Sequence, residues 1–114
     1  MALDVHCKIW IEHDGRAVFG DGRIRLLQAI ADAGSLTAAA KALRMPYRTA
    51  WQHLRLMEKA YGRKLLERKT GGAKGGECCL TQAGEALLRS YARFRRGVDE
   101  MIEKRFRRFM LAER

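Results

Sequence analysis

The sequence predicts one domain of the mainly α class with a small β component. Two observations support this fold class. Apolar residues recur at helical spacing in successive stretches after residue 23, and again in one long stretch after residue 81. Short alternating or glycine-bounded segments, typical of β-hairpins, precede the first and the last of these stretches. Since 114 residues support one modest core, we expect residues 1–114 to form a single domain.

The N-terminal segment predicts a strand or hairpin. Residues 5–11 alternate between apolar and polar side chains, which is the pattern of a half-buried strand. Residues 14–15 (Asp-Gly) are a strong turn signal, and residues 17–19 supply the expected return strand. We expect Gly20 and Gly22 to interrupt the chain before the first helix.

Residues 35–60 predict a helix-turn-helix. A helical period begins at Arg23 and is expected to end at Gly34. Ser35 is a good N-cap for a second helix that runs to Leu43. Pro46 suits the first turn of a third helix, over residues 46–60. Two short helices with a tight connection, the second of them polar and basic, are typical of a unit that reads the major groove of DNA.

The third helix predicts a core face and a DNA face. If Ala50, Leu54 and Met57 face the core, the opposite face holds the candidate DNA contacts Tyr47, Arg48, Thr49, Gln52 and Arg55. Arg48 and Gln52 are the expected base readers, because Arg hydrogen-bonds guanine and Gln hydrogen-bonds adenine. Arg55 is expected to contact phosphate. Trp51 is expected to brace the helix against the domain.

Residues 64–80 predict a wing, meaning a hairpin that lies along the DNA. Its tip is rich in glycine, which lets backbone amides approach phosphates, and its flanks are basic. The candidate contacts there are Arg68, Lys69, Thr70 and Lys74.

After an expected N-cap at Thr81, residues 82–110 predict one long helix with a continuous apolar stripe. The stripe is too long for a small core to cover alone, and an exposed stripe marks an interface. The candidate dimer contacts are Leu87, Tyr91, Phe94, Val98, Met101 and Ile102. The other interpretation is that the stripe folds back onto its own domain.

Four segments, in order, carry a family resemblance: residues 32–43 (DAGSLTAAAKAL), 47–51 (YRTAW), 66–72 (LERKTGG) and 80–84 (LTQAG). They resemble the N-terminal winged-helix domain of the ModE family of molybdate-responsive regulators, and more widely the LysR-type regulators. The resemblance implies a bacterial or archaeal transcriptional regulator that binds DNA as a homodimer through its long C-terminal helix. Arg44 departs from the pattern, since glycine is common at this position of the turn.

Full-length ModE regulators also carry C-terminal molybdate-binding domains. This sequence ends at Arg114. We therefore expect no effector site and no cofactor in it, and any molybdate response would need a separate effector-sensing partner.

Charge and composition restrict the function classes. The formal net charge is +10, and the acidic excess lies within residues 1–22, so the rest of the chain is strongly basic. A basic body favours double-stranded DNA as partner over a membrane surface. No apolar run approaches the roughly 20 residues of a membrane span, and the N-terminus lacks a secretory signal pattern. Together with an odd number of cysteines, this favours the cytoplasm.

Catalysis and metal binding are not expected. No nucleophile–base pair or cofactor motif is present, and the histidines lack ligand spacing. Cys78 and Cys79 would point to opposite faces of a strand, which disfavours joint ligation of one metal. The favoured function is thus a sequence-specific transcriptional regulator. The alternatives are a non-specific architectural DNA-binding protein and a thiol- or metal-sensing interaction module.

Overall fold

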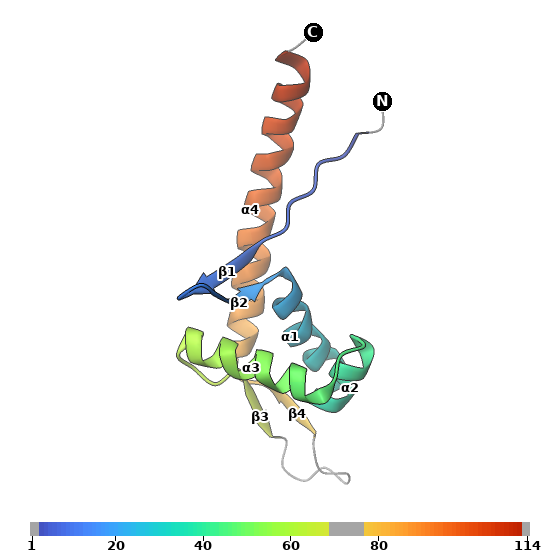
Figure 1. Ribbon diagram of the computed structural model, residues 1–114, viewed down its shortest axis with the longest axis vertical. Helices are drawn as coiled ribbons and strands as arrows, with labels where there is room; N and C mark the ends of the chain where they lie inside the picture. The colour runs from blue at the N-terminus through green and yellow to red at the C-terminus, as the bar shows by residue number, and fades with distance from the viewer. Residues whose placement is uncertain (1–2, 69–76, 113–114) are drawn as a thin grey trace.

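A computed structural model describes residues 3–68 and 77–112 (Figure 1). Within these residues the chain forms a small helical body with a hairpin on either side and one long helix that extends out of it. The elements are β1 (Trp10–His13), β2 (Arg16–Gly20), α1 (Asp21–Ala33), α2 (Leu36–Ala42), α3 (Tyr47–Tyr61), β3 (Leu66–Arg68), β4 (Cys78–Leu80) and α4 (Gln82–Ala112). The mainly helical class with a small β component is confirmed.

The N-terminal hairpin is shorter than expected. β1 pairs antiparallel with β2, but β1 begins only at Trp10, so the prediction of a strand over residues 5–11 is wrong in its bounds. The predicted alternation still appears as burial: Val5, Cys7 and Ile9 are half-buried, and their polar neighbours are exposed. Ile9 is held at the start of α1, since its amide donates to the Asp21 carboxylate (3.1 Å) and its carbonyl accepts from the Asp21 amide (3.0 Å).

α1 starts directly after the hairpin. Gly22 lies inside the helix, so the expectation that it interrupts the chain is wrong. Gly20 does mark the boundary. Its φ is 141°, and a Cβ there would lie 2.6 Å from the carbonyl oxygen of Ile9. A glycine is needed at this point because the chain crosses its own backbone too closely for any side chain.

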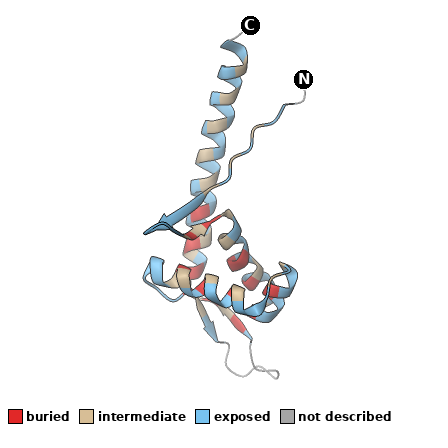
Figure 2. Ribbon diagram, in the orientation of Figure 1, coloured by how far each residue is buried: buried red, intermediate tan, exposed pale blue. Residues whose placement is uncertain are grey.

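The core lies between α1, α2 and α3 and extends to β4 and the first turns of α4. Figure 2 shows the buried residues gathered in the body and around the start of α4, with the outer part of α4 exposed or half-buried. Alanines on α2 let the neighbouring helices pack closely, since they fill little space. The largest fully buried side chains are Leu26, Leu27, Ile30, Met57 and Leu65.

α4 begins with a close approach to the segment that follows α3. The Thr81 hydroxyl accepts from the Gly84 amide (3.0 Å), which confirms the predicted N-cap. The same hydroxyl donates to the Lys64 carbonyl (2.6 Å), and the Thr81 amide donates to the Leu65 carbonyl (3.0 Å). A Cβ on Gly84 would lie 2.5 Å from that Leu65 oxygen. The motif of residues 80–84 (Leu-Thr-x-x-Gly) therefore fastens the start of α4 to residues 64–65, which follow α3.

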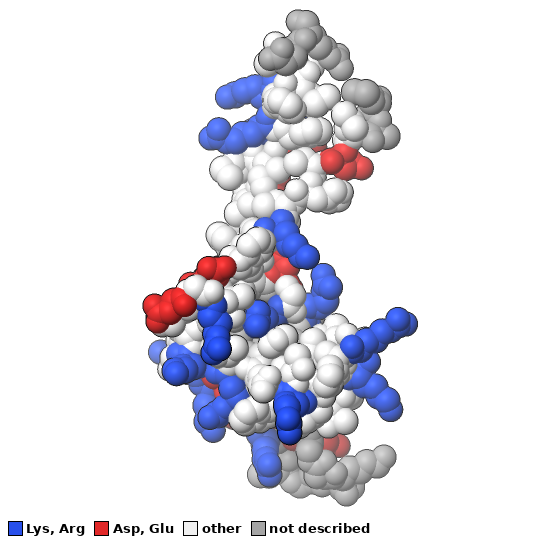
Figure 3. Space-filling model, viewed as in Figure 1, with Lys and Arg blue, Asp and Glu red and all other residues white. Residues whose placement is uncertain are grey.

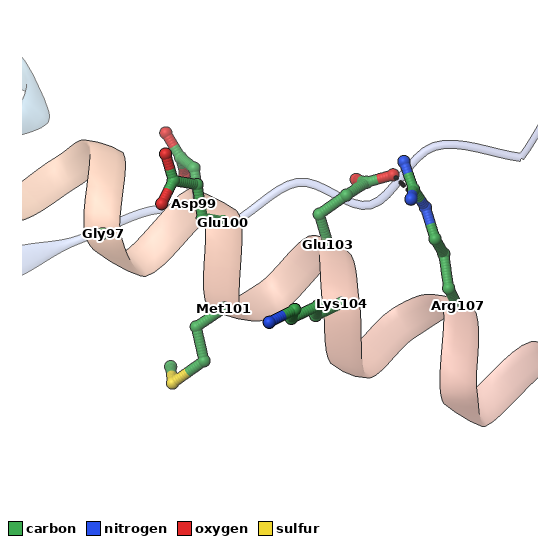
Figure 4. A pocket seen from close by; sticks show the side chains of 7 residues that line it. All are labelled: Gly97, Asp99, Glu100, Met101, Glu103, Lys104 and Arg107. Atoms are coloured by element: carbon green, nitrogen blue, oxygen red, sulfur yellow. Dashed lines mark ion pairs between the residues drawn. The ribbon is translucent and has the colours of Figure 1, made fainter.

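The outer part of α4 extends away from the body (Figure 1). The whole of α4 has 31 residues and is about 46 Å long. A shallow hollow on its surface is lined by α4 residues only (Figure 4), so one helix shapes it from one side. Figure 4 shows the Glu103–Arg107 ion pair on the rim of this hollow, with N···O 3.4 Å. Such a one-sided hollow cannot enclose a small ligand. No helix in the described ranges is long and apolar enough to cross a bilayer.

Candidate nucleic-acid interface

The turn between α2 and α3 sets the position of α3. The Ser35 hydroxyl accepts from the Ala38 amide (3.0 Å), which confirms the predicted N-cap of α2. Arg44 has a φ of 56°, which explains why glycine suits this position of the turn. Pro46 is extended and lies just before α3, one place earlier than the expected first turn.

α3 has the two faces that its spacing predicts. Ala50, Leu54 and Met57 are buried, with 0%, 5% and 0% of their surface exposed. The candidate DNA contacts Tyr47, Arg48, Gln52 and Arg55 are exposed on the helix, whereas Thr49 is half-buried. The core face thus fixes α3, and a polar stripe with two arginines remains free to meet a ligand.

Trp51 does not brace α3 against the domain, so that expectation is wrong. It is 46% exposed, and the Arg55 guanidinium lies over its ring at 5.4 Å from the centroid. Trp51 is one residue away from the buried Ala50, which turns its side chain by about 100° from the core direction. Arg55 also approaches Glu58 at 3.9 Å. Trp51 therefore belongs to the exposed face and supports an arginine there.

The base of the wing is tied to the start of α2. β3 and β4 are antiparallel, with Arg68 opposite Cys78. The Cys78 amide donates to the Gly34 carbonyl (2.8 Å), and Glu77 forms a β-bridge with Ser35. Arg68 is exposed on β3. The other candidate wing contacts, Lys69, Thr70 and Lys74, lie outside the described residues.

The charge distribution agrees with the prediction of an acidic N-terminal segment and a basic remainder of the chain. Figure 3 shows Lys and Arg side chains spread over the body, with acidic side chains beside the N-terminal hairpin. On α3, His53 adds no positive charge at neutral pH, because burial and the neighbouring Arg23 hold its pKa below the ordinary value. The basic character of the body therefore comes from its Lys and Arg residues.

The cysteine pair is divided between two environments. Cys78 is 7% exposed and belongs to the core, and burial raises the pKa of its thiol. Cys79 is half-buried, and its sulfur lies 3.8 Å from the Glu67 carboxylate. The two side chains differ in burial as neighbours on a strand should. The described parts of the chain contain no group of three or more potential metal ligands.

Comparison with known sequences decides the family. Residues 22–85 match the family described as "Bacterial regulatory helix-turn-helix protein, lysR family". The match spans more than half of the chain, from α1 to the start of α4.

The chain belongs to the LysR family of bacterial helix-turn-helix regulators.

Within this LysR-type group, the relatives point to ModE. The chain is similar to the transcriptional regulator ModE of Haemophilus influenzae, with 48% identity over 69 residues, or 60% of this chain and 27% of the relative. It is also similar to the molybdenum-pterin-binding protein MopA of Rhodobacter capsulatus, with 35% identity over 81 residues, 71% of this chain and 31% of the relative. The matched stretch thus covers less than a third of the length of each of these relatives. The resemblance to the N-terminal domain of ModE is confirmed.

A solved structure supports the fold and the ligand of the LysR-type domain. The chain is similar to the DNA-binding domain in the CbnR_DBD–DNA complex, with a TM-score of 0.57 and 28% identity. The match covers 82% of this chain and 97% of that one. The winged helix-turn-helix fold is confirmed, and the chain carries a DNA-binding domain of the LysR/ModE type of transcriptional regulator.

One cluster in this LysR-type domain has no signal in the sequence. At the first turn of α1, the Asp21 carboxylate accepts from the Tyr91 hydroxyl and lies 3.7 Å from Arg95. Arg95 also donates to the Cys7 carbonyl and pairs with Asp99 (3.3 Å). The cluster connects the N-terminal segment, α1 and α4.

The cluster shifts the pKa values of Asp21, Tyr91 and Arg95. Burial raises the pKa of Asp21, but the Tyr91 hydroxyl, the Ile9 amide and Arg95 together outweigh burial and hold that pKa below its ordinary value. Burial and the bond to Asp21 raise the pKa of Tyr91. Asp21 is thus held as a carboxylate and Tyr91 as a neutral phenol.

The candidate dimer residues lie on α4 in two groups. Leu87 and Tyr91 are each 9% exposed, because they pack within this chain. Phe94 and Met101 are 47% and 49% exposed, and Val98 and Ile102 are half-buried. The stripe is therefore covered at its start and uncovered farther along.

Proposed function

We propose that the chain is a sequence-specific transcriptional regulator that binds double-stranded DNA as a homodimer. The observation that carries the proposal is the division of α3: its apolar face is buried in the core, and Tyr47, Arg48, Gln52 and Arg55 are exposed on its polar face. A helix held in this way fits the major groove, where each base pair presents a distinct donor and acceptor pattern.

We assign base reading to Arg48 and Gln52, near the start of α3. Recognition helices use N-terminal residues to contact base edges. Arg55 and Arg68 contact phosphates in this assignment, with Tyr47 and Thr49 beside them. The wing residues Lys69, Thr70 and Lys74 remain proposed phosphate contacts from the sequence. The cytoplasm is the location that this function requires.

The homodimer rests on the uncovered part of α4. The proposed interface lies mainly on Phe94, Val98, Met101 and Ile102, because Leu87 and Tyr91 are already packed within the chain. A second copy would cover the exposed apolar face. A dimer would also present two copies of α3 to a site with two-fold symmetry.

Selection from a random duplex library tests the proposal. The parent chain is expected to enrich a pseudo-palindromic site. Arg48→Ala and Gln52→Ala are expected to relax the preference at individual positions, with a cost of about 1–3 kcal/mol per lost contact.

Lys41→Ala, an exposed charge on α2, is the matched control and should keep the preference. Equal enrichment of all sequences by the parent chain would favour an architectural DNA-binding protein instead. An unchanged preference in both α3 variants would refute the assignment of the base readers.

A further inference from the structure

Basic side chains gather where α3 ends, beyond the residues assigned to base reading. We propose that Lys59, Arg63 and Lys64, together with Arg55, form a second phosphate-binding site that holds the DNA backbone beside the major groove. The inference rests on the proposed function, since it requires α3 to face the DNA.

Lys59 continues the exposed stripe of α3. At about 100° per residue, Arg48, Gln52, Arg55 and Lys59 fall within an arc of about 60° on the helix. All four are exposed. Lys59 therefore lies on the same face of α3 as the first three side chains, and it points toward a DNA duplex that contacts them.

The length of the stripe exceeds the width of the groove. Residues 48 and 59 are about 17 Å apart along the helix axis. The major groove of B-DNA is about 12 Å wide. If Arg48 contacts base edges and α3 lies across the groove, the far end of α3 approaches one of the phosphate strands that border the groove.

The chain turns back at the end of α3 and adds two more cations. Gly62 adopts a left-handed conformation with φ 80°, which reverses the direction of the chain. As a result, Arg55, Lys59, Arg63 and Lys64 line one hollow of about 440 Å³. Four cations around one depression attract the negatively charged phosphodiester groups of a DNA backbone.

The acidic residue of this hollow is already engaged. One Glu58 carboxylate oxygen accepts from the Leu65 amide (2.9 Å), and the other lies 3.9 Å from Arg55. Glu58 therefore repels a phosphate less than a free carboxylate would. It also holds the segment with Arg63 and Lys64 against α3.

The backbone around Lys64 is fixed from the opposite side as well. The Thr81 hydroxyl donates to the Lys64 carbonyl (2.6 Å), and the Thr81 amide donates to the Leu65 carbonyl (3.0 Å). The two basic residues thus stand on a segment held by both α3 and the start of α4. A prearranged backbone reduces the entropy that ordering on binding would cost.

The test compares two double variants on one probe. The probe is a mixed-sequence duplex of about 30 base pairs, titrated by fluorescence anisotropy between roughly 50 and 200 mM KCl. Arg63→Ala with Lys64→Ala is expected to weaken binding roughly tenfold at low salt. It should also flatten the slope of log K against log[salt] by about 1.8, because two phosphate contacts are lost.

Arg96→Ala with Arg107→Ala is the matched control. It removes the same formal charge from exposed positions on α4 and should leave the slope unchanged. Circular dichroism checks that both variants fold. Equal slopes in the two double variants overturn the inference, because the charge effect would then be general.

A third variant is expected to change the affinity for DNA in the opposite direction. Glu58→Gln retains an amide oxygen that accepts from Leu65 but removes the negative charge from the hollow. It is expected to tighten binding about threefold at low salt. Unchanged or weaker binding by the folded variant overturns the phosphate site.

The outcomes distinguish this inference from the proposed function. If the parent chain fails to bind the duplex, the proposed function itself fails. If the parent binds and the Arg63/Lys64 variant keeps the parent's slope, only the phosphate site fails. In the library selection this variant should enrich the same sequence as the parent, since phosphate contacts position the protein but do not specify bases.

Discussion

The two parts of α4 carry the same apolar spacing but have opposite surroundings. In the first turns, Gly84, Leu87 and Tyr91 are buried against the body. Farther along, Phe94, Met101 and Phe109 are 47%, 49% and 64% exposed. Apolar periodicity therefore predicts a helix and its apolar face. Whether that face is buried depends on which other elements pack against it.

The largest expected effect comes from truncating one leucine in the covered part. Leu87→Ala should lower the free energy of unfolding by about 3 kcal/mol, because it leaves a cavity in the core. Met101→Ala is the matched change in the uncovered part and should cost a monomer less than about 1 kcal/mol. Thermal unfolding of both variants over a hundredfold range of protein concentration measures the two effects.

The same two variants test the dimer. The loss in Leu87→Ala should persist at every concentration, whereas the loss in Met101→Ala should appear as weaker self-association by sedimentation equilibrium. If Met101→Ala associates as the parent does, this part of the stripe is not an interface.

Two glycines, one in each part of α4, are expected to change the stability in opposite directions when replaced by alanine. Gly84→Ala should destabilise the protein by about 2 kcal/mol, because its Cβ would lie 2.5 Å from the Leu65 carbonyl oxygen and force the backbone apart. Gly97→Ala lies on the same helix with no atom within 4 Å of the new Cβ. It should stabilise the helix by about 0.5–1 kcal/mol. Urea denaturation measures both, and two changes of the same sign would contradict the described packing.

The smallest expected effect concerns the junction between the two parts. Tyr91→Phe removes the bond to Asp21 and should cost about 1 kcal/mol at neutral pH. The pKa of Asp21 is lowered in the fold, so its contribution is present above about pH 4 and is lost as the pH falls further. The pKa of Tyr91 is raised, so its contribution is present below about pH 10 and is lost as the pH rises.

Urea midpoints at acid, neutral and alkaline pH test this junction. The parent should lose stability at both extremes, and Tyr91→Phe should respond less at both. Tyr61→Phe is the control, because it keeps the ring packed edge-on against Phe19 and lies outside the cluster. An equal alkaline response in the parent and Tyr91→Phe would exclude Tyr91 as its source.

The sequence predicts the interface best where one residue type has one structural role. Ser35 and Thr81 cap helices as expected, because a hydroxyl just before a helix can accept from a backbone amide of the first turn. The burial of Ala50, Leu54 and Met57 follows from their spacing alone. The buried residues fix which face of α3 packs on the core, and the opposite face is therefore the exposed stripe.

The remaining features depend on partners that are distant in the sequence. Arg95 reaches Cys7 across 88 positions, and Asp21 reaches Tyr91 across 70. Such pairs fix where the N-terminal segment runs, and they explain why the regular strand starts late. Trp51 was mispredicted because a large aromatic residue next to a core position suits either face. The side chain that meets it, Arg55, decides the outcome.

The unequal burial of Cys78 and Cys79 makes β4 a reporter of local motion. A thiol reagent reaches the half-buried Cys79 in the native state, whereas the buried Cys78 reacts only when β4 separates from the core. Because burial no longer raises the pKa of Cys78 once β4 has opened, the ratio of the two labelling rates gives the equilibrium constant for opening of the wing base. Two consecutive residues thus supply both a measure of this breathing motion and its reference rate.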